Sequence, residues 1–243
     1  MTNHIIEEML SMRNENQAQH LMKFFKTAKG QYGYGDLFLG IKVPITRNIV
    51  KKYRNNIDLN GIDVLLQSQW HEIRLTGFLL LIELFNTYTK KKKLKTAEEI
   101  VLFYLDHISY GNNWDLVDLV APKILGIWIV AFPEKAEILY ELSDRMDNLW
   151  HQRVAIVSTW SEIRSDRFDI TLRLAEKYLT HPHDLIHKAT GWMLREVGKR
   201  EKGLPLLRAF LDKYASQMPR TMLRYSIEKL DNDERQKYLS QRK

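Results

Sequence analysis

The chain has 243 residues, of which 44% are hydrophobic, so it is long enough and apolar enough to bury a sizeable core. It contains no cysteine, which excludes disulfides, thiolate zinc sites and a cysteine nucleophile. The 37 basic and 30 acidic residues give a net charge of +7, which favours an anionic partner such as nucleic acid or a membrane surface.

No segment of the sequence has the pattern of a membrane or export element. The first ten residues, MTNHIIEEML, lack the positively charged start and the apolar run of a secretory signal. No apolar run, such as GFLLLI at residues 77–82, approaches the length needed to span a bilayer. We therefore expect a cytoplasmic protein with one domain over residues 1–243 and no membrane partner.

Helical periodicity runs through nearly the whole chain, and no segment shows the alternation of a strand. The glycine-rich stretch GQYGYGDLFLGIKVP at residues 30–44 predicts a long ordered connection; it lacks the preceding strand and following helix of a phosphate-binding loop. The KKKK run at residues 90–93 predicts a solvated turn between two helices. Most prolines stand just before helical pattern, where the missing N–H costs nothing: Pro44, Pro122, Pro133, Pro182 and Pro219.

Four helical segments can be aligned with one another at a period of roughly 35 to 40 residues, which is typical of HEAT and armadillo repeats. They are HEIRLTGFLLLIEL, GNNWDLVDLVAPKI, HQRVAIVSTWSEIR and LIHKATGWMLREVG. Stacked repeats of this length form an α-solenoid, in which equivalent positions of successive helices share one surface. The sequence therefore predicts an all-α fold, an α-solenoid of HEAT-like helical repeats with a concave basic face.

The alignment defines two columns of equivalent positions, one turn apart on the same helix faces. The first column is mostly cationic and consists of Arg74, Trp114, Arg153 and Lys188. The second is mostly apolar and consists of Phe78, Asp118, Val157 and Trp192. We expect Trp114, Asp118, Arg153 and Trp192 to converge, although they come from different repeats.

Asp118 is the exception in its column, and two interpretations stay open. A carboxylate among apolar residues needs a cationic partner, and Arg153 on the next helix could supply a structural ion pair. Alternatively, two tryptophans beside a carboxylate form an aromatic-walled site for a bound cation. Asp115 lies off the column and is expected to be solvated or ion-paired. The other tryptophans are expected to pack in the core: Trp70, Trp128, Trp150 and Trp160.

The histidines of HPHDLIH at residues 181–187 suggest a metal site, because His183 and His187 are four residues apart and could share a helix face. No glutamate completes a zincin motif, and HEIRL at residues 71–75 lacks the second histidine. We therefore expect neither a metal nor a cofactor. No Ser/His/Asp arrangement or Walker-type loop is present either.

Four segments of the sequence resemble the DNA alkylation repair family of HEAT-like DNA glycosylases, the AlkD type. They are FLGIKVPITR (38–47), NWDLVDLVAPKILG (113–126), NLWHQRVAIVSTW (148–160) and KATGWMLREVGK (188–199). The resemblance covers most of the chain. It implies binding of double-stranded DNA that carries a positively charged alkylated purine. It also implies hydrolysis of the N-glycosidic bond without flipping of the base into a pocket, unlike most glycosylases. A closed concave DNA site needs only one subunit, so we expect a monomer.

The resemblance also assigns residues. Asp118 matches the catalytic aspartate of the family, and Trp114 and Trp192 match its two tryptophans at the lesion. Arg153 matches a DNA-contacting arginine. We expect DNA binding by three basic residues: Arg153, Lys188 and Arg195. Two positions depart from the family pattern, since Asn113 replaces an aromatic of some members and Phe25 replaces a tyrosine that contacts DNA; both departures are expected to change affinity or lesion range.

Two other functional classes remain open at the level of sequence. A non-catalytic DNA-binding protein of the same fold would recognise damaged or branched DNA, with salt-sensitive binding and no base release. A protein–protein scaffold would have no affinity for nucleic acid and an apolar concave face. The joint presence of Trp114, Asp118, Arg153 and Trp192 favours the enzyme.

Overall fold

The computed structural model describes residues 1–241, and every regular element within them is helical. The prediction of an all-α fold is therefore confirmed. A single isolated bridge between Leu37 and Trp70 is the one strand-like pairing among these residues. The chain divides into two compact units, Met1–Val120 and Ala121–Lys243. The single domain expected from the sequence remains a prediction.

The first unit consists of α-helices and one short 3₁₀ helix, η1. In chain order they are α1 (Thr2–Ser11), α2 (Glu15–Phe24), α3 (Val43–Tyr53), α4 (Leu59–Leu66), α5 (His71–Lys90), α6 (Leu94–Asp106), η1 (Ile108–Tyr110) and α7 (Trp114–Val120).

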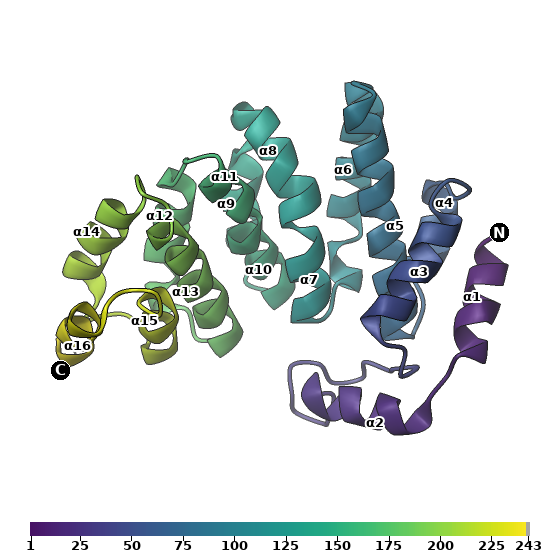
Figure 1. Ribbon diagram of the computed structural model, residues 1–243, viewed down its shortest axis with the longest axis horizontal. Coiled ribbons are helices and arrows are strands. Elements are labelled where there is room, and N and C mark those ends of the chain that lie inside the picture. Colours follow the sequence, from purple (N-terminus) through teal and green to yellow (C-terminus); the bar gives the residue numbers. More distant parts are fainter. Residues whose placement is uncertain (242–243) are drawn as a thin grey trace. The chain divides into compact units, whose positions relative to one another are not determined.

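Helix α5 forms the centre of the first unit. Apolar residues surround most of its circumference, and a helix of this kind needs neighbours on several sides. Helices α3, α4, α6 and α7 all pack against it, with α4 and α6 lying on either side of it in Figure 1. Gly77 permits the close approach of α4, because a Cβ at this position would lie 2.9 Å from Cδ2 of Leu66.

The connection between α2 and α3 is ordered, as the sequence predicts, because a buried carboxylate holds it. Glu72 of α5 accepts hydrogen bonds from the backbone N–H groups of Leu39 (2.8 Å), Gly40 (2.8 Å) and Ile41 (3.1 Å). Gly40 has a φ of +84°, and a Cβ here would lie 2.1 Å from the carbonyl oxygen of Asn14. The loop thus follows a path that only glycine permits.

The second unit contains shorter helices interrupted by a π-helix (η2) and two 3₁₀ turns (η3 and η4). In chain order they are η2 (Pro122–Gly126), α8 (Ile127–Ala131), η3 (Pro133–Lys135), α9 (Glu137–Ser143), α10 (Leu149–Ser158), α11 (Trp160–Arg164), α12 (Asp169–Lys177), η4 (Tyr178–Thr180), α13 (Asp184–Gly198), α14 (Leu204–Tyr214), α15 (Arg220–Ser226) and α16 (Asn232–Ser240).

Helix α13 is the centre of the second unit and packs against α10, α12, α14 and α15. The closest of these contacts is with α15. A Cβ at Gly191 would lie 2.5 Å from the carbonyl oxygen of Met222, so glycine is what allows the two backbones to approach. This packing fixes the face of α13 that carries Lys188, Trp192 and Arg195.

Within each unit, helices that follow one another in the chain pack side by side, as helices do in an α-solenoid (Figure 1). The four aligned segments lie on α5, on α7 and the start of η2, on α10 and α11, and on α13. The concave basic face remains a prediction. In the described part of the chain, no helix combines the length and hydropathy needed to cross a bilayer.

The tryptophans predicted to pack in the core fall into two groups. Trp128 and Trp150 are buried, as expected. Trp70 and Trp160 are only half-buried, and the guanidinium groups of Arg13 and Arg164 lie over their rings at 5.3 and 4.8 Å. Lys90 is the last residue of α5, and the other three lysines of the KKKK run form an exposed turn between α5 and α6, as predicted.

Candidate functional site

Asn113, the residue immediately before α7, links this helix to the rest of the first unit. Asn113 is fully buried, and its side-chain oxygen accepts a hydrogen bond from the N–H of Trp114 at 2.9 Å. Its side-chain nitrogen faces the carbonyl oxygen of Phe25 at 3.5 Å and Oδ2 of Asp36 at 3.4 Å. The residue that replaces an aromatic of the family pattern therefore holds the start of α7 in place.

Trp114 is half-buried and packs against an aromatic cluster formed by the end of α2 and the loop that follows it. Its ring packs against Phe25 with centroids 5.3 Å apart, and Phe25 in turn stacks on Phe38 at 5.1 Å. Phe25 is only 8% exposed, so it supports Trp114 from the interior. The exposed aromatic neighbour is Phe24, which is 61% accessible and meets Trp114 edge-on at 5.9 Å.

Beneath this cluster, His71 bridges two carboxylates. Its Nδ1 lies 2.7 Å from Oδ2 of Asp36, and its Nε2 lies 2.9 Å from Oδ2 of Asp115 in the first turn of α7. Burial disfavours a charge on His71, but the two carboxylates outweigh it and raise the pKa of the imidazole to about 9. His71 is therefore an imidazolium at neutral pH, and Asp115 is ion-paired, as expected from the sequence.

Asp36 is fully buried and has a second cationic partner. Burial alone would raise the pKa of this carboxyl, but His71 and Arg74 together lower it below the usual value. Arg74 Nη2 donates to Asp36 Oδ1 at 2.6 Å and to Asn112 Oδ1 at 2.9 Å. The other guanidinium nitrogens of Arg74 donate to the carbonyl oxygens of Ser68 and Tyr110. The guanidinium of Arg74, a member of the cationic column, is thus buried and is not a surface charge.

Asp118 lies one turn after Trp114 on α7 and is half-buried beside the buried residues Val117 and Val120. Tyr104 is a fully buried tyrosine on α6. Burial raises the pKa of the Tyr104 phenol, and the charge of Asp118 raises it further. Asp118 thus lies at the edge of the core, and its catalytic role stays a prediction.

The remaining predicted residues belong to the second unit, on α10 and α13. Arg153 is 5% exposed, and its Nη1 donates to the carbonyl oxygen of Leu185 at 2.5 Å. Lys188 pairs with Asp184 at 2.8 Å and is 42% exposed. Trp192, one turn further along α13, is half-buried.

Arg195 is the most enclosed of the cations on α13. Its side chain is 19% exposed, and it forms ion pairs with Glu196 at 3.3 Å and with Glu228. Its positive charge is therefore largely balanced within the second unit, which leaves Lys188 as the most accessible of the three basic residues predicted to bind DNA.

The histidines of residues 181–187 have structural roles. His183 caps α13, because its Nδ1 accepts a hydrogen bond from the N–H of Leu185 at 3.1 Å. His181 contacts Gln152 Oε1 at 2.8 Å, and His187 contacts the carbonyl oxygen of His181 at 2.5 Å. Burial lowers the pKa of both His181 and His183. Among residues 1–241, no group of three or more His, Asp or Glu side chains is arranged to hold a metal ion.

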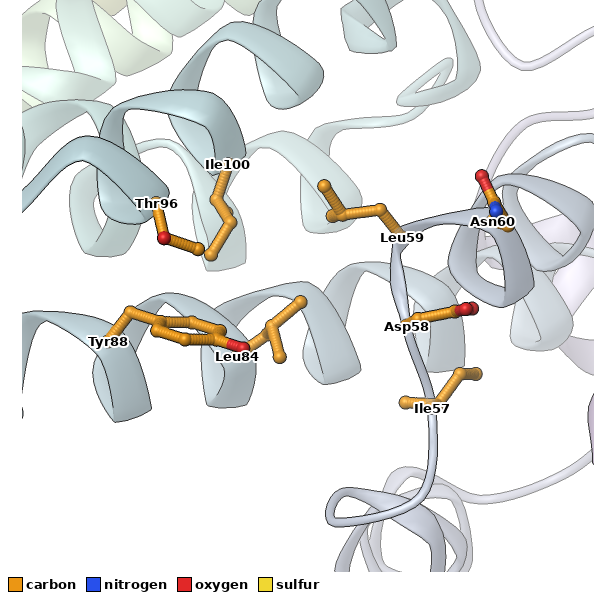
Figure 2. Close-up of a pocket in the computed structure, with 8 residues that line it drawn as sticks. All are labelled: Ile57, Asp58, Leu59, Asn60, Leu84, Tyr88, Thr96 and Ile100. Carbon is orange, nitrogen blue, oxygen red and sulfur yellow. The ribbon is translucent and has the colours of Figure 1, made fainter. Parts of the chain in front are cut away.

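A cavity of about 290 Å³ lies elsewhere in the first unit, between α4, α5 and α6 (Figure 2). Leu84 and Tyr88 of α5 face Thr96 and Ile100 of α6 across it, and Leu59 closes one end. Its lining includes one charged residue, Asp58, whose carboxylate caps α4. The cavity shares no residue with the cluster around α7.

Sequence reasoning found Trp114 and Asp118 but missed the buried charges behind them. His71 drew attention only as part of an incomplete zincin motif, and Asp36 lay within the glycine-rich connection. A signal was present in the sequence: His71 stands at the start of a helix with a long apolar central run, where a buried charged group requires partners. The identity of those partners depends on tertiary packing.

Comparisons with known proteins found a matching family model and a solved structure with a similar fold. A family model described as DNA alkylation repair enzyme matches residues 5–230. A solved structure described as a predicted DNA alkylation repair enzyme from Enterococcus faecalis superimposes with a TM-score of 0.71 at 19% identity, over 91% of this chain and 98% of that one. At this identity the likeness concerns the fold alone. A search of curated proteins gave no match.

Proposed function

Because this chain belongs to the DNA alkylation repair enzyme family, we propose that it is a DNA glycosylase acting on duplex DNA. The substrate is a positively charged purine alkylated at N3 or N7, and the reaction hydrolyses its N-glycosidic bond as the first step of base excision repair. The base is not drawn into a pocket. The observation that carries this proposal is the pair on α7, a half-buried tryptophan followed one turn later by the carboxylate of Asp118.

The chemistry needs only one carboxylate. Alkylation gives the purine a positive charge, so the base leaves as a neutral molecule and requires no acid. Positive charge then develops on the sugar, and an anionic Asp118 near C1′ stabilises this oxocarbenium-like state and orients the attacking water. Two opposite charges about 4 Å apart interact by about 4 kcal/mol at an effective dielectric constant near 20. This corresponds to roughly a thousandfold in rate if it is expressed only in the transition state.

Trp114 binds the cationic nucleotide in this proposal. An indole face attracts a cation by about 0.5 to 2 kcal/mol, depending on how far water is excluded. The exposed ring of Phe24 beside it extends the aromatic surface available to the substrate. Trp192 on α13 retains its proposed role as the second substrate-binding residue.

Binding of the DNA backbone is assigned to the basic residues of the second unit. Lys188 is the first candidate for a phosphate contact, because its side chain is more exposed than those of Arg153 and Arg195. Like Lys188, which pairs with Asp184, Arg195 would have to exchange a carboxylate partner for a phosphate. Arg153, which is buried, contributes by holding the start of α13 through Leu185. We propose a monomer that binds duplex DNA, with affinity that falls steeply with salt.

A second candidate function is a non-catalytic protein that recognises damaged or branched DNA. The proximity of Asp118 to buried Tyr104 supports it, because a carboxylate at the edge of a core can be structural.

Base release distinguishes the two functions. The glycosylase should release 7-methylguanine or 3-methyladenine from methylated duplex DNA and leave uracil and hypoxanthine, which are neutral bases, in place. Equal release of neutral and cationic bases, or duplex binding without any release, would contradict the proposal.

A further inference from the structure

A row of alternating charges runs from the interior of the first unit to the first turn of α7. Asp36, His71 and Asp115 are linked by contacts of 2.7 and 2.9 Å, and both imidazole nitrogens face a carboxylate oxygen. An imidazole with one proton can donate only one hydrogen bond, so this geometry is satisfied by the doubly protonated imidazolium. His71 itself is 2% exposed.

The surroundings of His71 are fully occupied. Phe38 stacks on the imidazole with centroids 4.3 Å apart, and Phe25 lies over it at 5.2 Å. The charged groups that face the row are Asp36 from the loop, Arg74 from α5 and Asp115 from α7. The neighbouring carboxylate, Glu72, is directed at the loop backbone. Two cations therefore balance two carboxylates in this row.

The outer end of the row holds α7. Asp115 Oδ2 contacts His71, whereas Asp115 Oδ1 is buried and has no hydrogen-bond partner among residues 1–241, so the imidazolium is the group that anchors this carboxylate. Asp115 follows Trp114 directly in the chain. Phe25 touches both the Trp114 ring and the His71 ring. The position of Trp114 is thus coupled to His71 through the backbone and through an aromatic contact.

We propose that His71 is a positioning residue for the glycosylase: its imidazolium fixes the first turn of α7, so that Trp114 and Asp118 are presented to the nucleotide in one geometry. This inference rests on the proposed function of these two residues. The carboxylates that flank His71 raise its pKa to about 9, which keeps the imidazolium charged at neutral pH. Misplacement of a reacting group by about 1 Å can slow catalysis about a hundredfold.

The test uses the full chain labelled with 5-fluorotryptophan and observed by ¹⁹F NMR, with the Trp114 resonance identified by Trp114→Phe. In the wild type, we expect this resonance to shift with pH with a midpoint near 9. In His71→Gln it should not titrate. In Asp115→Asn the midpoint should move to lower pH, because the carboxylate that most raises the pKa of His71 is gone.

A matched control is available in the same unit. His107 is partly buried, contacts Asp63 Oδ1 at 2.8 Å and stacks on Phe103 at 3.9 Å, so its contacts lie with α4, α6 and η1. His107→Gln should therefore leave the Trp114 titration unchanged. A Trp114 resonance that does not titrate near pH 9, or one that titrates equally in wild type and His71→Gln, would overturn the proposal whether or not the protein releases bases.

Base release supplies a second measurement. His71→Gln and Asp115→Asn are each expected to lower the excision rate at saturating enzyme by about tenfold to a hundredfold, with duplex Kd changed less than about twofold. If His71→Gln does not fold, Asp115→Asn tests the positioning role instead. The Asp115 side chain is 20% exposed, so its substitution disturbs the core less. Unchanged excision rates would overturn the positioning role. Absence of excision by the wild type, with the expected NMR titration, would instead overturn the proposed function and leave the coupling of His71 to Trp114 standing.

Discussion

The rings of Phe25 and Trp114 pack 5.3 Å apart, so that a buried phenylalanine forms the support on which a half-buried tryptophan stands. The neighbouring residue, Phe24, contacts the same indole from the solvent side. Two adjacent phenylalanines at the end of α2 thus have opposite environments. Phe25 therefore contributes to the stability of the site, whereas the ring of Phe24 is available to a ligand.

The first prediction concerns this pair. Phe25→Ala is expected to destabilise the protein by about 3 to 5 kcal/mol, because it removes a buried ring and leaves a cavity below Trp114. Phe24→Ala serves as the matched control and should change stability by no more than about 0.5 kcal/mol, since the ring is largely in solvent. Urea unfolding of the two variants measures the difference. Equal losses would mean that Phe25 does not support the cluster.

The second prediction tests the loop that carries Asp36. Gly40→Ala should be much more destabilising than Gly35→Ala, although both glycines have positive φ and share a conformational cost of about 1 to 2 kcal/mol. At Gly35 a Cβ would meet open space, whereas at Gly40 it would lie 2.1 Å from the backbone oxygen of Asn14. Thermal unfolding compares the two. Similar melting temperatures would contradict the loop path described above.

The third prediction concerns the buried charges. Asp36→Asn is expected to cost about 3 to 5 kcal/mol, because it leaves His71 and Arg74 without a buried counter-charge. Asp63→Asn is the control: it removes the carboxylate partner of His107 at a more exposed position and should cost about 1 kcal/mol or less. Denaturant unfolding at pH 7 gives both values. A small effect at Asp36 would argue that the row of charges is not coupled.

The same charges give the pH dependence of stability. The folded pKa of His71, about 9, lies above its ordinary 6.5, so its stabilising contribution is complete below pH 6.5 and is lost as the pH rises through about 9. The pKa of Asp36 is lowered, so its contribution is complete above its ordinary 3.8 and is lost as the pH falls through the folded value. The difference in unfolding free energy between wild type and His71→Gln should therefore shrink between pH 6.5 and 9. A difference that stays constant over this window would show that His71 is not charged in the folded protein.

The sequence predicted the helical fold, because helical periodicity is a local signal, and it singled out α7 because an aspartate stands among its apolar residues. It could not predict that Arg74 is internal. Arg74 occupies the same column as Lys188, and only the buried Asp36, which lies 38 positions earlier in the chain, distinguishes the two environments. The partner of a charged residue is set by tertiary packing, which one sequence does not reveal.

Phe25 illustrates a second limit of the sequence. Comparison with the family pattern suggested that Phe25 replaces a DNA-contacting tyrosine, yet its ring lies in the interior and Phe24 is the exposed residue. At the end of a helix, neighbouring positions point in directions about 100° apart, so small differences in where α2 ends decide which ring faces solvent. Asn113 is similar, since its role in holding the start of α7 follows from three contacts that spacing does not predict.

The fourth prediction addresses DNA binding. Lys188→Ala is expected to weaken duplex binding and to reduce the slope of log K against log salt by about 1, as for the loss of one phosphate contact. Arg195→Ala should change the slope less, because the Arg195 side chain is more enclosed than that of Lys188 and is paired with two carboxylates, Glu196 and Glu228. Fluorescence anisotropy with an undamaged duplex at several salt concentrations measures both slopes. An unchanged slope in Lys188→Ala would remove this residue from the proposed interface.

The measurement that tests the central claim most directly is release of 7-methylguanine or 3-methyladenine from methylated duplex DNA by wild type and Asp118→Asn. Asp106→Asn, which changes an exposed carboxylate in the same unit, is the control and should match the wild type. We expect wild-type release that falls about a hundredfold or more in Asp118→Asn, with duplex binding retained. Equal release by the wild type and Asp118→Asn, or no release by either while both bind duplex, would contradict the assignment of Asp118 as the catalytic residue.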